Sequence, residues 1–312
     1  MIYFPERVYE RYGTLTAFCK EKREKTMTRE LIDTHQHLWV MSERAYSWIE
    51  PAYGPLYDDF TPERLAPEIP ASGVTSSVLV QAADTYDDTF YMLDVAEHSN
   101  FVQGVVGWVP FERPNESRTA LEIFSKNKYF KGVRNLTHDY SNPKYESDDA
   151  WITRPAVLET LGHVERLGLS FDYVSIKPEH TKNIVTLAKK FPKLKIVVDH
   201  FAKPPIAAKE MEPWASSMAE IAAFPNVYAK LSGLNTASDL ANWTVADWQP
   251  YVDFMVKTYG ANRVMMGGDW PVIVLGNTYV EVWKAQVEVI SGYSQDDQDW
   301  ITHKTAKAFY NL

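Results

Sequence analysis

The sequence has a single cysteine, Cys19, among its 312 residues. One thiol excludes a disulfide framework within the chain and any zinc or iron–sulfur site built from several cysteines. No run of about 18 apolar residues occurs, so no membrane-spanning helix is predicted. Lys and Arg residues do not outnumber Asp and Glu residues either. The formal net charge is −9, which argues against nucleic acid or an anionic membrane as a partner, because both require clustered Lys and Arg.

Several catalytic and binding motifs are also absent from the sequence. There is no GxGxxG or GxxxxGK[ST] loop, the usual signatures of dinucleotide and phosphate binding. The GxSxG and HExxH motifs are missing too, and Cys19 lies in a charged N-terminal stretch. The sequence therefore indicates neither a serine or cysteine nucleophile nor a zinc-protease motif.

The N-terminal 30 residues differ in character from the rest of the chain. They lack the apolar core of a signal peptide, and they contain Glu6, Glu10, Glu21 and Glu24, which a transit peptide would avoid. Residues 1–30 are therefore predicted to form a solvated or weakly helical extension. One domain is predicted over residues 31–312, and the protein is expected to be cytoplasmic.

From Leu31 onward, short apolar runs alternate with longer segments of helical period. The predicted strands are Leu31–Thr34, Ser77–Gln81, Val102–Trp108, Gly132–Arg134, Leu169–Tyr173, Lys195–Asp199, Val227–Leu231 and Val264–Gly267. The predicted helices include Phe90–His98, Trp151–Leu167, Lys182–Phe191, Trp214–Phe224, Trp248–Tyr259, Tyr279–Ile290 and Asp297–Tyr310. This alternation predicts a parallel sheet, and eight units favour a closed (β/α)₈ (TIM) barrel. A doubly wound open sheet is the alternative, but it would usually carry one of the glycine-rich loops that are missing.

Chemistry in such a barrel lies at the carboxyl ends of the strands. His35 and His37 follow the first predicted strand. Residues two apart in an extended strand point the same way, so both imidazoles are expected to face one space. Two neutral imidazoles on one side are natural ligands for a divalent metal. The structural alternative is a pair of buried histidines that hydrogen-bond to the backbone at the strand end.

Two further residues at strand ends extend this cluster. Asp269 follows two glycines that allow a bend, and an ionised aspartate can take a proton from water. Its structural alternative is a cap for the next helix. His200 follows the sixth strand and is a candidate third metal ligand or a donor to a substrate carbonyl.

Arg134 and Lys230 are cations on predicted strands. A cation inside a barrel is unfavourable unless it is paired or used. Both are candidates for binding an anionic group or stabilising an oxyanion. The alternative is a salt bridge with Asp172 or Asp199, and the sequence does not decide between these roles.

Aromatic and loop residues near the strand ends are further candidates for substrate binding. Trp39, Trp108 and Trp270 present flat faces that suit stacking on a sugar ring, although packing at the barrel rim is the commoner reason for such residues. His138 and His180 are placed in loops at the catalytic end, where they are candidates for contact with the substrate.

The sequence resembles the amidohydrolase superfamily, and within it the sugar lactonases that act on fucono- and rhamnono-lactones. The resemblance runs from about Leu31 to Leu312. Its motifs are Ile32-Asp-Thr-His-Gln-His-Leu-Trp39, Gly104-Val-Val-Gly-Trp-Val109, Gly132-Val-Arg134, Val198-Asp-His200, Lys203-Pro-Pro205, Lys230-Leu-Ser-Gly-Leu234, Gly268-Asp-Trp-Pro-Val272 and Thr305-Ala-Lys-Ala-Phe-Tyr310. Gly268 departs from the serine that such relatives often have. The segment after Arg134 also differs from the family pattern.

The resemblance implies a (β/α)₈ barrel that hydrolyses a lactone to a hydroxy acid. Asp269 would be the general base, and His35, His37, His200 and Asp269 would surround one divalent metal. Zinc is the expected ion, although some lactonases of this group resemble metal-independent enzymes. Binuclear members carry a bridging lysine on a middle strand, and none is found at the end of the fourth or fifth strand here. Enzymes of this kind are often homodimers.

The functional hypothesis is therefore hydrolysis of a small aldonolactone by base-assisted attack of water. A metal-dependent decarboxylase on the same barrel is the first alternative. The second is a barrel that binds a sugar acid without turnover.

Overall fold

The computed structural model describes residues 29–136 and 150–312. The predicted extension (1–30) lies almost wholly outside these ranges, and so does His138. In the ranges covered, no helix is both long and apolar enough to cross a membrane.

Eight parallel strands follow one another around a barrel in sequence order. They are β1 (Ile32–Gln36), β2 (Ser76–Val80), β3 (Val102–Gly107), β4 (Phe130–Arg134), β5 (Ser170–Tyr173), β6 (Lys195–Val198), β7 (Val227–Leu231) and β8 (Val264–Met266). The first and last strands meet just beyond β8, where Gln36 forms a parallel bridge with Trp270. The predicted barrel is confirmed, and each predicted strand overlaps an observed one.

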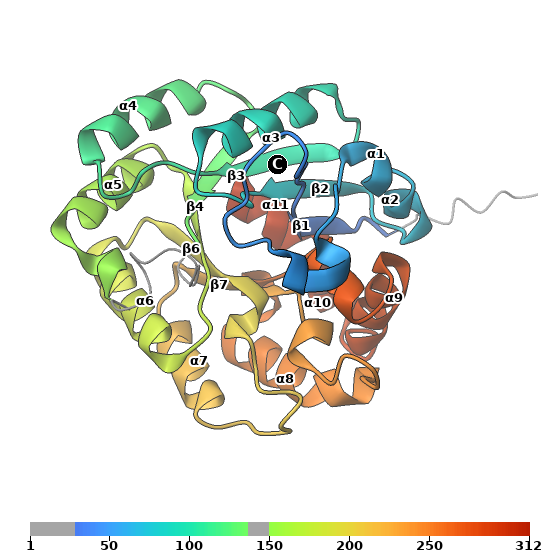
Figure 1. Ribbon diagram of the computed structural model, residues 1–312. Helices are drawn as coiled ribbons and strands as arrows, with labels where there is room; N and C mark the ends of the chain where they lie inside the picture. The colour runs from blue at the N-terminus through green and yellow to red at the C-terminus, as the bar shows by residue number, and fades with distance from the viewer. Residues whose placement is uncertain (1–28, 137–149) are drawn as a thin grey trace, which may run out of the picture.

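Most helices ring the outside of the strands, while the C-terminal helix lies across one end of the barrel (Figure 1). The helices are α1 (Pro62–Leu65), α2 (Glu68–Ala71), α3 (Tyr86–His98), α4 (Pro114–Phe124), α5 (Pro155–Arg166), α6 (Pro178–Lys190), α7 (Trp214–Ala222), α8 (Val245–Tyr259), α9 (Tyr279–Val289), α10 (Gln295–Asp299) and α11 (Thr305–Tyr310), with a π-helical turn at Trp300–Lys304. Several begin at recognisable caps. Thr244 and Asp247 form a reciprocal capping box on α8, and α4, α5 and α6 start with proline at the first helical position.

The helices predicted from the sequence do not include the short α1 and α2, nor the longer α4. This helix buries only Ser117, Leu121 and Phe124. A stripe that contains a serine is a weak apolar signal, and its remaining positions are mostly polar. The predicted helix at the C-terminus is present, as α10, the π-helical turn and α11 in succession.

Two apolar cores hold the barrel together. The larger one fills the space between the strands and the surrounding helices. The smaller one lies inside the barrel, where it joins Val78, Val80, Val106, Val197 and Met265 to Phe309 and Tyr310 of α11. The C-terminal helix therefore closes one end of the barrel. The polar residues at the carboxyl ends of the strands are left at the other end.

Candidate active site

The two histidines of β1 converge as the strand period predicts. Their Nε2 atoms lie 3.0 Å apart, and both side chains are buried. The Nδ1 atom of His37 lies 2.8 Å from the carbonyl oxygen of Val80. Because a carbonyl only accepts, a neutral His37 must carry its proton on Nδ1. Its Nε2 lone pair therefore points into the shared space.

His200 reaches the same space through an unusual piece of backbone. Residues 200–203 all have positive φ, between 50° and 58°, although none of them is glycine. Such residues cost about 1–2 kcal/mol each, and clusters of them are typical of functional sites. This left-handed turn follows β6 directly. It brings Nδ1 of His200 to 2.8 Å from Oγ of Ser232, just beyond β7.

Asp269 completes the cluster from the end of β8. It has a φ of 59°, and its backbone N–H donates to the carbonyl oxygen of His35 at 2.6 Å. Its Oδ1 atom lies 3.6 Å from Nε2 of His37 and 3.8 Å from Nε2 of both His35 and His200. Burial opposes ionisation of this carboxyl, but the adjacent His200, His37 and Lys203 outweigh it and lower the pKa of Asp269 to about 2. The carboxylate is therefore charged at neutral pH.

The glycines before Asp269 have a packing reason. A Cβ at Gly267 would lie 2.8 Å from Cβ of His35, and one at Gly268 would lie 2.3 Å from Oδ2 of Asp33. Asp33 accepts hydrogen bonds from the N–H groups of His35 and Gly268 and from the hydroxyl of Tyr279. The close contact of β8 with β1 thus fixes the position of Asp269 relative to His35.

Three of these side chains form a group that fits a divalent metal, and His200 lies beside it. His35, His37 and Asp269 offer ligand atoms that lie within 4.8 Å of one another. Two nitrogen ligands of one tetrahedral zinc ion lie about 3.3 Å apart, because each bond is about 2.0–2.1 Å long. In addition, the buried Oδ2 atom of Asp269 has no hydrogen-bond partner in the described part of the chain. Burial lowers the pKa of His35 and of His200 well below the usual value, so both imidazoles are neutral, as metal ligation requires.

A sequence model of the amidohydrolase family matches residues 32–312. The chain belongs to this family. It is 36% identical over 259 residues to an L-fucono-1,5-lactonase from Burkholderia ambifaria, which covers 82% of this chain and 86% of the relative. It also resembles the crystal structure of an amidohydrolase from Burkholderia multivorans with bound HEPES, at a TM-score of 0.81 and 26% identity, over 91% of this chain and 99% of the other. A second crystal structure of an amidohydrolase from that species, with bound Zn, has a TM-score of 0.80 and 25% identity over the same shares.

Behind the cluster, this amidohydrolase buries a second set of charges. Lys230 is fully buried, and its Nζ atom lies 2.5 Å from Oδ2 of Asp172 and 3.2 Å from Oδ1 of Asp199. Nε of Arg134 lies 3.1 Å from Oδ2 of Asp199. Burial opposes ionisation of Asp199, but Lys230 and Arg134 outweigh it and lower its pKa. Of the two roles left open for these cations, the structure shows the salt bridges. The contact of Lys230 with a substrate stays a prediction.

The three tryptophans occupy different environments. Trp39 is fully buried, donates to the carbonyl oxygen of Asp58, and packs edge-on against Trp48 and Phe60. Trp270 is 3% exposed and also packs on Phe60. Trp108 is half-buried and packs on Tyr86. The structure thus gives Trp39 and Trp270 packing partners. Trp108 is the most exposed of the three candidates for stacking on a sugar.

Several residues near the site were not assigned a role from the sequence. Ser232 orients His200, and Tyr310 donates from the C-terminal helix to Asp172 at 2.6 Å. Lys203 ends the left-handed turn, where its Nζ atom lies 3.3 Å from Oγ1 of Thr236. Burial lowers the pKa of Lys203. The predicted loop residue His180 is buried within α6.

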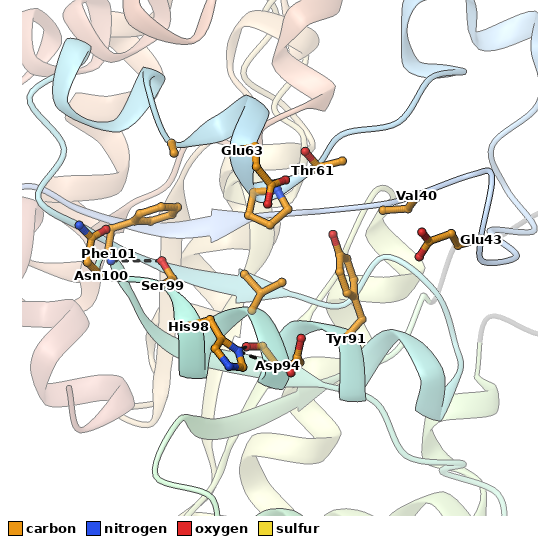
Figure 2. Close-up of a pocket in the computed structure, with 13 residues that line it drawn as sticks. Val40, Glu43, Thr61, Glu63, Tyr91, Asp94, His98, Ser99, Asn100 and Phe101 are labelled. Atoms are coloured by element: carbon orange, nitrogen blue, oxygen red, sulfur yellow. Dashed lines mark hydrogen bonds and ion pairs between the residues drawn. The ribbon is translucent and has the colours of Figure 1, made fainter.

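A separate hollow of about 720 Å³ lies outside the barrel, and none of the predicted site residues lines it. Figure 2 shows Tyr91, Asp94 and His98 of α3 on one side of it, with Thr61 and Glu63 at the start of α1 on the other. Nδ1 of His98 lies 2.9 Å from the backbone oxygen of Asp94, an ordinary contact on a helix surface. This hollow therefore does not compete with the barrel end as the active site.

Gly233 provides a test of how tightly the cluster is built. It has a φ of +60°, and a Cβ there would lie 2.9 Å from Nδ1 of His200 and 3.0 Å from Oδ2 of Asp269. We expect Gly233→Ala to lower kcat/KM at least about tenfold, equivalent to about 1.4 kcal/mol, because both groups must move. Steady-state kinetics on the purified variant measure this loss. Gly292→Ala is the control, since nothing lies within 4 Å of its added Cβ, and unchanged kinetics in Gly233→Ala would contradict the geometry.

Proposed function

We propose that the protein hydrolyses a small sugar lactone to its hydroxy acid, with one divalent metal, zinc by preference, at the His35, His37, His200 and Asp269 cluster. The observation that carries the proposal is the convergence of three imidazoles on a buried, ionised Asp269 at the carboxyl end of a barrel. The similarity to an L-fucono-1,5-lactonase supports a lactone as the substrate class.

Asp269 is proposed as the general base. Its carboxylate takes one proton from water while the water oxygen bonds to the lactone carbonyl carbon. When the ring C–O bond breaks, the leaving ring oxygen takes up a proton, so that a hydroxy acid is formed with no other reactant. Positioned base catalysis of this kind contributes about 10²–10⁴-fold. A bound zinc ion would supply Lewis acidity and lower the pKa of a coordinated water.

The substrate is proposed to sit over this cluster, at the open end of the barrel. Trp108 is retained as a proposed substrate contact because it is half-buried. Arg134 is retained as well: its Nε pairs with Asp199 and its NH1 group donates to the carbonyl oxygen of Gln81 at 2.9 Å, which fixes the orientation of the guanidinium. His138 remains a prediction that falls outside the described residues.

Acid release from a panel of five- and six-membered sugar lactones, followed with a pH indicator, tests this proposal. Rapid turnover of at least one lactone is expected. If none is hydrolysed and a carboxylated aromatic acid instead loses CO₂, the protein is a decarboxylase. Tight binding of sugar acids with no turnover of either class would indicate a non-catalytic barrel.

Removal of the metal is expected to reduce the activity strongly. Dialysis against a chelator should lower kcat/KM at least about 10²-fold, since a metal ion supplies several kcal/mol of transition-state stabilisation. Added zinc should restore the rate in proportion to the zinc bound, measured by plasma mass spectrometry. Full activity in protein shown to contain less than a tenth of an ion per chain would overturn the metal part of the proposal and leave the lactonase part intact.

A further inference from the structure

We infer that the ammonium group of Lys230 is the resident cation of an inner site, and that it restricts the catalytic centre to one metal ion. The inference rests on the proposed function only in taking the outer cluster as metal-binding. Nζ of Lys230 lies 2.5 Å from Oδ2 of Asp172, 3.2 Å from Oδ1 of Asp199 and 3.0 Å from Nδ1 of His35. Two carboxylate oxygens are also donors that a divalent metal accepts.

The inner position is adjacent to the outer cluster and shares a residue with it. His35 directs Nε2 towards His37 and Asp269, and Nδ1 towards Lys230 and Asp199. His35, Asp199 and His200 form a second group whose ligand atoms lie within 4.8 Å of one another. A neutral imidazole has a single lone pair, so when Nε2 of His35 serves the outer cluster, Nδ1 carries the proton and faces Oδ1 of Asp199 at 3.3 Å. The ammonium of Lys230 then pairs with the carboxylates of Asp172 and Asp199, which are the donors of the inner position.

The charges explain why the inner position needs no metal. Burial and the neighbouring Asp199 raise the pKa of Asp172, and the contact with Lys230 opposes this rise. With both carboxyls ionised, Asp172 and Asp199 carry two negative charges, and Lys230 and Arg134 supply two positive charges at contact distance. All four side chains are nearly or fully buried, where an unpaired charge would be strongly unfavourable. The inner set is thus neutral by itself. The carboxylate of Asp269 is then available to balance part of the positive charge of a metal ion in the outer cluster.

A purely structural salt bridge would make a different prediction. If Lys230 only pairs with Asp172 and Asp199, its removal destabilises the fold and creates no new affinity for metal. If it occupies a cation site, shortening the side chain leaves the carboxylates of Asp172 and Asp199 around an open space. That space should then take up one zinc ion, and the bound ion should restore the lost stability.

The experiment compares zinc bound per chain in the full-length wild type and in Lys230→Ala, after equilibration with zinc and gel filtration. Thermal melting is measured with and without zinc. The inference predicts that Lys230→Ala binds one ion more than the wild type and that zinc raises its melting temperature more. Two controls should gain no ion. Lys230→Met fills the space with a neutral chain, and the double variant Lys230→Ala with Asp172→Asn lacks one carboxylate.

Each outcome has a separate meaning. An equal zinc count in wild type and folded Lys230→Ala overturns the inference, as does a wild type that saturates at two ions. If Lys230→Ala does not fold, Lys230→Ser replaces it, because its hydroxyl can donate to the carboxylates. If neither folds without zinc, refolding of Lys230→Ala in the presence of zinc supports the inference, and failure to refold with zinc overturns it. A wild-type count of zero contradicts the outer metal, while a gain of one ion in the variant would still support the inner site.

Discussion

The variant Asp269→Asn is expected to hydrolyse the lactone with a kcat/KM about 10²–10⁴-fold below that of the wild type. The amide has the shape of the carboxylate but cannot accept a proton from water. The backbone at this position is held by the hydrogen bond from the Asp269 N–H to the carbonyl oxygen of His35, which the substitution does not touch. The loss should therefore appear in catalysis, with the melting temperature and the fold retained.

Two comparisons make this result specific. Asp239→Asn changes an exposed aspartate in the loop after β7, and its kinetics should match the wild type. Zinc bound to Asp269→Asn should also be measured, because Asp269 is proposed both as base and as metal ligand. Low activity at full zinc occupancy supports the base, whereas low activity that follows zinc loss supports the ligand role alone. Wild-type turnover by Asp269→Asn would show that another group takes the proton.

The sequence predicts those parts of the site that depend on the two-residue side-chain repeat of a strand and on where each strand ends. The two-residue repeat of a strand places His35 and His37 on one face, and the end of each strand identifies His200, Asp199 and Asp269 as neighbours around the barrel. Those expectations need only the register of a parallel barrel, and the observed strands agree with it. The alternation of short apolar runs with segments of helical period was enough to predict the barrel fold.

Other features depend on contacts between distant segments. The hydroxyl of Tyr310 donates to Asp172, which is 138 positions away in the sequence. No local sequence pattern predicts that contact. The left-handed turn at 200–203 contains no glycine, so the usual sequence signal for positive φ is missing. Whether Lys230 is paired or free depends on which carboxylates converge on it, and the sequence left both roles open.

Trp39 carries the largest expected effect on stability. Its indole is fully buried and packs against Trp48, Phe60 and Tyr46. We expect Trp39→Ala to lower the free energy of unfolding by about 3–5 kcal/mol, as is usual for a buried aromatic side chain. A typical domain has about 5–15 kcal/mol in total, so a large part of the stability would be lost. Urea denaturation of the purified variant measures the change.

The same experiment decides between the two roles considered for the tryptophans. Trp108→Ala is the matched comparison, because Trp108 is only half-buried and should cost less stability. A sugar contact would raise KM, whereas a packing role would lower the fraction of folded protein and leave KM unchanged. We expect the first pattern in Trp108→Ala and the second in Trp39→Ala. A raised KM in a stable Trp39→Ala variant would restore the stacking role to Trp39, and would mean that the packing of Trp39 against Trp48 and Phe60 opens to admit the substrate.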